Sequence, residues 1–422
     1  MWYFHLQPKE ERLLIMYNFR RFHFILILLL CSFTATTVYA QKQYKSIRTV
    51  LKAKNGAEAM RLVETCEKDS ILQKNPQTYD YGTQAQIIIN DAENVKAYLK
   101  QPYDTVKFFQ STCKIFEYIL KCEQAELDLL EREGKKQKFM KENRQRLHQF
   151  YRNLGAGGRF FFAKGKYKEA QQLMTYYLDT PLKPIWGDDK SVTTQPAYVN
   201  TAFTYQRAAF LSGNFADVAN YSDLTLADTS YRRNVIELLV RSAEALGDTV
   251  LMSKRLIEGI KDYPSDTYFF TRLTDYFSAN EDYDHALLLA DSLLQIYPNQ
   301  LLYMASRTIS LMNLQRYPEG IEAAKECLAL DSTLIDMRFF IGAAYCKMAS
   351  EISLPTNINS KTYRDKKLQM QELYNAARPY MEEYRSARPD KSDKWLPLLE
   401  RIYWNLNLGL QYDEISKLMQ KK

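Results

Sequence analysis

A register of 34 residues repeats through the second half of the chain and constrains its fold more than any other feature. Shifting the sequence by this period superimposes four pairs of residues: Tyr283 on Tyr317, Ala290 on Ala324, Leu294 on Leu328, and Pro264 on Pro298. A fixed period of 20 to 50 residues is typical of arrays of stacked structural repeats. The sequence therefore predicts an array in which each unit buries one face against its neighbour.

The composition indicates that these units are helical. The 422 residues include only 14 Gly and 13 Pro, too few for the many turns of an all-β protein, while 46% are hydrophobic. Long helices joined by short turns fit these numbers. The 31 Tyr and 21 Phe are expected to fill the space between helix layers.

Short motifs within the repeats resemble those of the tetratricopeptide family, whose first helix carries Leu-Gly-x-x-Tyr and whose second carries Ala-x-x-x-Phe before a proline. Residues 341–345, Ile-Gly-Ala-Ala-Tyr, match the first-helix motif, and small residues are expected where paired helices cross closely. The resemblance covers about residues 151–349. It implies an all-α, right-handed α-solenoid of antiparallel helix hairpins that acts as a non-enzymatic scaffold for a protein or peptide partner.

The chain is expected to divide into four segments. Several helices are predicted in the second segment, at Ala57–Lys68, Gln84–Leu99, Asp104–Glu133 and Lys135–Leu154. The four segments are a signal peptide at 1–40, divergent helical hairpins at 41–150, repeats at 151–391 with insertions near 181–197 and 350–372, and capping helices at 392–422.

The first 40 residues have the features of an export signal. Arg20 and Arg21 precede an apolar stretch at 22–33, and Ala40 offers a small residue for cleavage, with Met16 as a suitable start. The apolar stretch is shorter than the roughly 20 residues of a membrane span. Leu30 before Cys31 is too bulky for a lipid-attachment motif. We therefore expect a cleaved, periplasmic or secreted protein with no stable membrane span.

The net charge argues against nucleic acid as a partner. It is +7 for the whole chain and +5 without residues 1–40, which hold four basic and two acidic residues. The densest basic run, Lys135-Lys136-Gln137-Lys138, is interpreted as a solvated helix start.

The cysteines are expected to be free thiols buried in the core. Five remain after the signal, and this odd number argues against a complete disulfide framework. Cys113 and Cys122 are nine residues apart on one predicted helix, about 13 Å, which is too far for a disulfide. The sequence leaves open whether Cys327 and Cys346 pair.

Few residues could carry catalysis. Only His148 and His285 follow the signal, and neither lies in a metal-binding spacing. The run Gly155-Ala156-Gly157-Gly158 lacks the lysine of a phosphate-binding loop, so helix packing explains it better. We expect no cofactor, no metal and no enzymatic activity.

A row of arginines is the candidate site. Arg159, Arg207 and Arg241 each follow the close-crossing residue of a first helix, and in this family the first helices line the concave groove. Phe162 and Phe210 follow the first two arginines by three residues. Because arginine bonds carboxylate in a bidentate fork, the row predicts an acidic peptide as ligand. The alternative is that the arginines pair with Glu237, Glu244 or other acids of the chain itself.

Two other functions stay open. A surface glycan-binding protein of a nutrient-uptake system would need exposed tryptophans among Trp186, Trp395 and Trp404. An enzyme would need a site built from Trp186-Gly187-Asp188-Asp189 and the insertion at 350–372. The partner and the oligomeric state cannot be predicted from the sequence.

Overall fold

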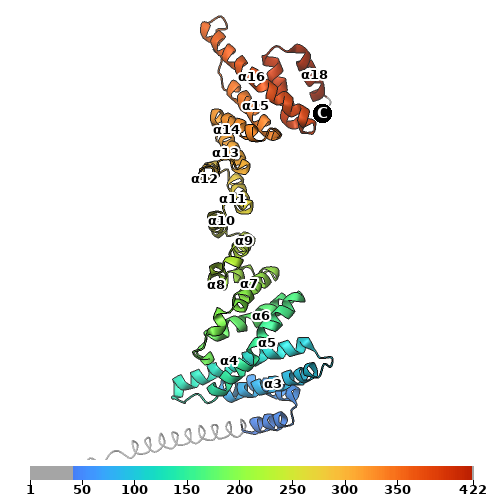
Figure 1. Cartoon of the computed structure of the whole chain (residues 1–422), viewed down its shortest axis with the longest axis vertical. Helices are drawn as coiled ribbons and strands as arrows, with labels where there is room; N and C mark the ends of the chain where they lie inside the picture. Colours follow the sequence, from blue (N-terminus) through green and yellow to red (C-terminus); the bar gives the residue numbers. More distant parts are fainter. Residues whose placement is uncertain (1–40, 421–422) are drawn as a thin grey trace, which may run out of the picture. The chain divides into compact units, whose positions relative to one another are not determined.

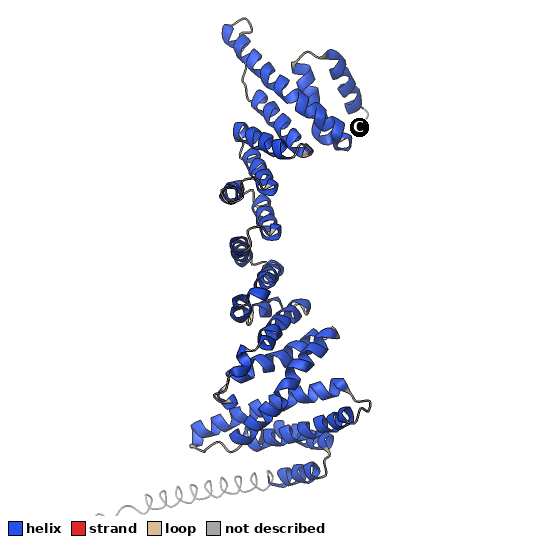
Figure 2. Ribbon diagram, in the orientation of Figure 1, coloured by secondary structure: helices blue, strands red, loops and turns tan. Residues whose placement is uncertain are grey.

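The computed structural model describes residues 41–420, and every regular element in this range is a helix (Figures 1 and 2). The predicted all-α class of antiparallel helix hairpins is confirmed. The expected signal peptide at 1–40 lies outside the described residues. Within them, no helix is long and apolar enough to cross a membrane.

The chain divides into two compact units, residues 1–249 and residues 250–422. This division does not follow the expected segments, whose boundary at 150/151 falls inside one helix, α5 (Met140–Ala163). The limits of those segments therefore stay predictions.

The first unit is a stack of hairpins in which each helix packs against the next along the chain. Alternate helices also touch. Helix α5 packs on α7, and α7 packs on α9. The unit opens with helical residues 41–52. Its further elements are α2 (Gly56–Glu67), η1 (Leu72–Lys74), α3 (Pro76–Tyr98), α4 (Thr105–Glu133), α5 (Met140–Ala163), α6 (Tyr167–Asp179), η2 (Thr180–Leu182), η3 (Pro184–Trp186), η4 (Ser191–Thr194), α7 (Pro196–Leu211), η5 (Phe215–Ala219), α8 (Ser222–Ala227) and α9 (Thr229–Ala245).

Two helices of this unit differ from the expected bounds. The helix predicted at Gln84–Leu99 begins earlier, at Pro76, because the Asn75 side chain accepts a hydrogen bond from the Gln77 amide and caps it. The helix predicted at Lys135–Leu154 runs instead over Met140–Ala163. It continues through the four residues 155–158, so the glycines lie inside a helix.

The insertion at 181–197 forms a strap of 3-10 turns that packs on α5. Ile185 and Trp186 are buried within the core of the unit. Arg144 Nε donates to the Ile185 carbonyl at 2.8 Å, and His148 Nε2 lies 3.1 Å from the Trp186 carbonyl oxygen. The strap therefore contributes Ile185 and Trp186 to the core, while most of its other residues are exposed.

The second unit continues the hairpin pattern, with α13 against α15 and α15 against α17. A loop follows α15 within the predicted insertion near 350–372, and a long helix follows the loop. The elements are α10 (Thr249–Asp262, whose first residue belongs to the first unit), α11 (Thr267–Ala279), α12 (Tyr283–Leu294), α13 (Leu301–Asn313), α14 (Tyr317–Leu330), α15 (Ile335–Ser350), α16 (Lys361–Ala387), η6 (Pro389–Lys391), α17 (Ser392–Asn405) and α18 (Gly409–Gln420).

The 34-residue register is visible in the helix starts. The first helices α11, α13 and α15 begin at residues 267, 301 and 335, and the second helices α12 and α14 begin at 283 and 317. The residue with positive φ after the first helix obeys the same period. It is Gly213, Gly247, Glu281 and Gln315 in turn, with φ between 55° and 80°.

Small residues lie where helices cross closely, as predicted. A Cβ atom on Gly158 would lie 2.7 Å from Met174 Cγ, and one on Gly342 would lie 2.5 Å from Met381 Sδ. Both distances are shorter than van der Waals contact, so a larger residue would separate the helices.

All five cysteines in the described residues are free and buried, which confirms the prediction for Cys113 and Cys122. It also answers the question left open for Cys327 and Cys346, which do not pair.

Candidate functional site

The three predicted arginines occupy equivalent positions in three successive hairpins of the first unit. Arg159 on α5, Arg207 on α7 and Arg241 on α9 each lie six residues before a left-handed glycine: Gly165, Gly213 and Gly247. All three side chains are exposed. We call Arg159, Arg207 and Arg241 the arginine row.

The phenylalanines contact the arginine of the following hairpin. Arg207 Cζ lies 5.1 Å from the ring centroid of Phe162 and 5.9 Å from that of Phe203. Arg241 Cζ lies 4.7 Å from the ring centroid of Phe210. Each is a cation–π contact. Those of Phe162 with Arg207 and of Phe210 with Arg241 link two neighbouring hairpins, whereas Phe203 and Arg207 both belong to α7. Arg159 and Phe162, which lie three residues apart on α5, form no cation–π contact with each other in the described structure. The contact of Phe203 with Arg207 was not predicted.

The two phenylalanines are themselves held in place by second-helix aromatics. Phe162 packs edge-on against Tyr167 with ring centroids 5.5 Å apart, and Phe210 packs in the same way against Phe215 at 5.4 Å. Arg207 and Arg241 lie over these two rings, and both arginines are exposed. A guanidinium group on a ring keeps its N–H donors in its own plane, where they can bond a carboxylate.

One arginine of the row, Arg241, has an acidic neighbour within the chain itself. Glu237 Oε1 lies 3.9 Å from Arg241 Nη1, at the limit of an ion pair, and the same carboxylate contacts Arg233. The Arg241 side chain is still 50% exposed. No acidic side chain of the described chain forms an ion pair with Arg159 or Arg207.

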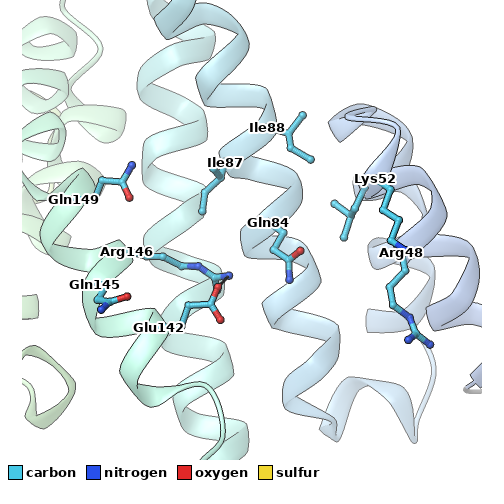
Figure 3. A pocket seen from close by; sticks show the side chains of 10 residues that line it. Arg48, Lys52, Gln84, Ile87, Ile88, Glu142, Gln145, Arg146 and Gln149 are labelled. Atoms are coloured by element: carbon cyan, nitrogen blue, oxygen red, sulfur yellow. Dashed lines mark hydrogen bonds and ion pairs between the residues drawn. The ribbon is translucent and has the colours of Figure 1, made fainter.

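A pocket that sequence reasoning missed lies in the same unit. It has a volume of about 640 Å³ and is bounded by helical residues 41–52, α3 and α5 (Figure 3). We call it the N-terminal pocket. Its lining consists of cations, amides, one carboxylate and three aliphatic residues: Arg48, Leu51, Lys52, Gln84, Ile87, Ile88, Glu142, Gln145, Arg146 and Gln149.

Arg146 is the buried charge of this pocket, with a side chain only 9% exposed. Its Nη1 donates to Asp80 Oδ1 at 2.7 Å and to Asn143 Oδ1 at 2.9 Å, and its Nη2 contacts Glu142. Removing one partner of such a buried ion pair lowers the stability of the fold, so these contacts hold the Arg146 side chain in place at the pocket. Arg48 and Lys52, on the opposite wall from Gln145 and Gln149, are exposed cations.

One face of α5 joins the pocket to the arginine row. Gln145, Gln149, Arg152, Ala156 and Arg159 are separated by steps of four and three residues, which places them on one side of a helix. Gln145 and Gln149 line the pocket, Arg152 is exposed between them and the row, and Arg159 belongs to the row. This spacing is the signal in the sequence that would have extended the predicted site.

The tryptophans considered for glycan binding differ in exposure, and the two insertions considered for an enzyme site belong to different units. Trp186 and Trp395 are buried, and their Nε1 atoms donate to the carbonyls of Asp189 and Arg388. Trp404 is 65% exposed and is the one such tryptophan in the described residues. The strap containing Asp188 belongs to the first unit, whereas the insertion at 350–372 belongs to the second.

Metal chemistry receives no support from the geometry. Among the described residues, no group of three or more His, Cys, Asp or Glu could hold a metal ion. His285 is 66% exposed and its Nδ1 lies 2.8 Å from the carboxylate of Asp282, which caps α12.

Fold and repeat pattern together define a tetratricopeptide-like helix-hairpin protein. No family model matches the sequence, and no curated protein matches it. Solved structures similar to the chain include the C-terminal part of a TPR repeat-containing protein from Cytophaga hutchinsonii, with 10% identity, a TM-score of 0.39, and coverage of 62% of this chain and 93% of that one.

Two further similar structures are the TPR2AB domain of yeast Sti1 and the TPR domain of P58(IPK). The first is 11% identical with a TM-score of 0.22 and covers 62% of this chain and 99% of that one. The second is 11% identical with a TM-score of 0.23 and covers 90% of this chain and 98% of that one. At these values the likeness carries no argument about partners.

Proposed function

We propose that this protein is a non-enzymatic scaffold that binds a carboxylate-bearing peptide segment of a partner protein along the arginine row. The observation that carries the proposal is the equivalence of Arg159, Arg207 and Arg241, two of which are oriented by a ring of the preceding hairpin. Exposed, oriented guanidinium groups at regular intervals suit a ligand with regularly spaced carboxylates.

The interval between hairpins suggests the spacing of those carboxylates. Packed helices lie about 8–10 Å apart, and an extended peptide advances about 3.3 Å per residue. Acidic side chains at every third residue would therefore meet successive arginines. The N-terminal pocket, on the same face of α5, would receive a neighbouring part of the ligand through its amides and through Arg48 and Lys52.

The proposal is tested with a fluorescent peptide that has glutamate at every third residue, and with its glutamine counterpart. Replacing both Arg207→Glu and Arg241→Glu should raise the Kd for the glutamate peptide about tenfold or more, because a hydrogen bond to a charged group contributes about 1.5–3 kcal/mol. Fluorescence anisotropy measures this change. The variant Arg207→Lys keeps the charge but loses the bidentate fork, so its Kd should be intermediate.

The matched control is Arg132→Glu, at an exposed arginine near the end of α4 whose Nε donates to its own helix at Asp128. It should leave the Kd unchanged. Equal binding of the glutamate and glutamine peptides, or an unchanged Kd in the double variant, would reject the arginine row. Cross-linking in intact cells followed by mass spectrometry would identify the partner.

We also propose that the scaffold works in the cell envelope, as a periplasmic or secreted protein. The support is the basic, apolar and small-residue sequence of residues 16–40. Sequencing the amino terminus of the protein recovered from cell fractions would test this, and a mature chain that starts at Met1 or Met16 would contradict it.

Glycan binding is the second candidate, favoured by one observation. Trp404 and Tyr412 have ring centroids 5.3 Å apart and line a hollow of about 300 Å³ together with Glu400 and Arg401. A glycan array with the wild-type protein and with Trp404→Ala tests this candidate. Absence of binding by the wild type would remove it.

A further inference from the structure

The connection between α15 and α16 forms an exposed tip. Helix α15 has 16 residues and α16 has 27, and the buried residues of α16 all come from its second half, from Tyr374 onward. We call the loop 351–360 together with the first turns of α16, up to Leu368, the tip segment. Its helical part thus has no buried side chain.

Aliphatic side chains are exposed on this tip segment. Leu354 is 37% exposed, Ile358 63% and Leu368 57%. Ile358 and Leu368 thus keep more than half of their surface exposed, whereas Leu354 is mostly covered. Exposed aliphatic side chains that cluster on one segment are typical of a surface that contacts another molecule or a membrane.

Four cations accompany these aliphatic residues. Lys361, Arg364, Lys366 and Lys367 lie within seven residues, against a single acid, Asp365. No described acidic side chain forms an ion pair with any of the four. Lys366 Nζ donates to the Ser353 carbonyl at 3.0 Å and ties the loop to the helix.

Two of the four cations share one side of the helix with an aliphatic residue. Lys361, Arg364 and Leu368 are separated by three and four residues, which places them on one helical face. Ile358 lies three residues before Lys361, in the loop that leads into that face. A ligand of the tip segment must therefore offer anionic groups next to an apolar layer.

We propose that the tip segment docks on the surface of an anionic phospholipid bilayer, with Lys361 and Arg364 against lipid phosphates and with Ile358 and Leu368 at the boundary of the acyl chains. Amphipathic helices with basic polar faces bind membranes in this way. Nucleic acid would use the cations and leave the aliphatic residues exposed to water. An anionic bilayer offers contacts to both the cations and the aliphatic residues.

The experiment measures sedimentation of the full chain with vesicles of phosphatidylglycerol and phosphatidylcholine in equal parts, and with vesicles of phosphatidylcholine alone. Stronger partition into the anionic vesicles is expected, and added salt should weaken it. The variant Lys361→Gln/Arg364→Gln should lower the partition coefficient about 25-fold, since each cation contributes about fivefold. The variant Ile358→Ser/Leu368→Ser should also lower it, at unchanged charge.

The control is Leu410→Ser, which removes an 87% exposed leucine from α18, outside the tip segment. Because residues 22–33 are themselves apolar, all comparisons are made between variants of the same chain, and circular dichroism verifies that each is folded. Equal partition into both vesicle types, or an equal loss in Leu410→Ser, overturns the proposal. Binding of an acidic protein to the tip segment without any partition into vesicles would also overturn it and indicate a protein partner.

Discussion

At the scale of single residues, the backbone after each first helix follows the repeat more closely than the side chains do. Gly213, Gly247, Glu281 and Gln315 follow one another at steps of 34 residues, and all four have positive φ. A side chain in the left-handed region costs about 1–2 kcal/mol, whereas glycine adopts it freely. Two repeats of the second unit therefore keep the turn at the expense of strain.

This strain leads to a stability prediction. Glu281→Gly should raise the free energy of unfolding by about 0.5–1 kcal/mol, because the relief of strain exceeds the added chain entropy of glycine. Urea unfolding followed by circular dichroism measures the change. The control Gln369→Gly, at an exposed position inside α16, should lower stability by about 1 kcal/mol. A loss of stability in Glu281→Gly would contradict the prediction.

At the scale of helices, glycines inside α5 allow it to contact two neighbours at once. A Cβ atom on Gly157 would lie 2.8 Å from Leu173 Cδ2 and 2.8 Å from the Phe109 ring. Leu173 is on α6 and Phe109 on α4. The glycine run thus belongs to helix packing, as its lack of a phosphate-loop lysine indicated.

Filling this contact should destabilise the first unit. Gly157→Val is expected to lower the free energy of unfolding by about 1–3 kcal/mol, because the added methyl groups have no space between α4 and α6. Chemical denaturation measures the loss. Ala163→Val, at an exposed site on the same helix, should change stability by less than about 0.5 kcal/mol. Similar effects of the two substitutions would show that α5 can shift to accept the side chain.

At the scale of the whole molecule, burial of thiols and phenols couples stability to alkaline pH. Burial raises the pKa of Cys113 and Cys346 to about 12, from an ordinary value of 9.0. It also raises the pKa of Tyr44, Tyr198 and Tyr403 to about 12, from 10.0. Both units contain such groups.

The sign of the effect follows from these pKa values. Below pH 9 these groups are protonated in both states, so they do not favour unfolding. Between pH 9 and pH 12 the unfolded chain releases protons that the folded chain retains, and the free energy of unfolding should fall as the pH rises. Urea unfolding at several pH values measures this fall, and a constant stability from pH 9 to pH 11 would contradict it.

Most of the fold could be predicted from the sequence because its signals are local. The 34-residue register was predicted, and the starts of α11, α13 and α15 follow it, since each hairpin repeats one hydrophobic pattern and one turn. The long helix α4 was predicted almost to the residue because Asp104 caps its start and Gly134 ends it in a left-handed conformation. The start of α3 was missed, although Asn75 and Pro76 form a recognisable helix start.

The sequence by itself determined the all-α hairpin class, the repeat period and the positions of the arginine row, because periodicity and turn residues act over short distances along the chain. Only the tertiary structure decided that Phe162 contacts Arg207, that the strap with Trp186 is core, and that Arg48, Gln84 and Arg146 enclose one pocket. These features depend on residues that lie 36 or more positions apart in the sequence. Such contacts form only when neighbouring hairpins pack, and no local pattern specifies them.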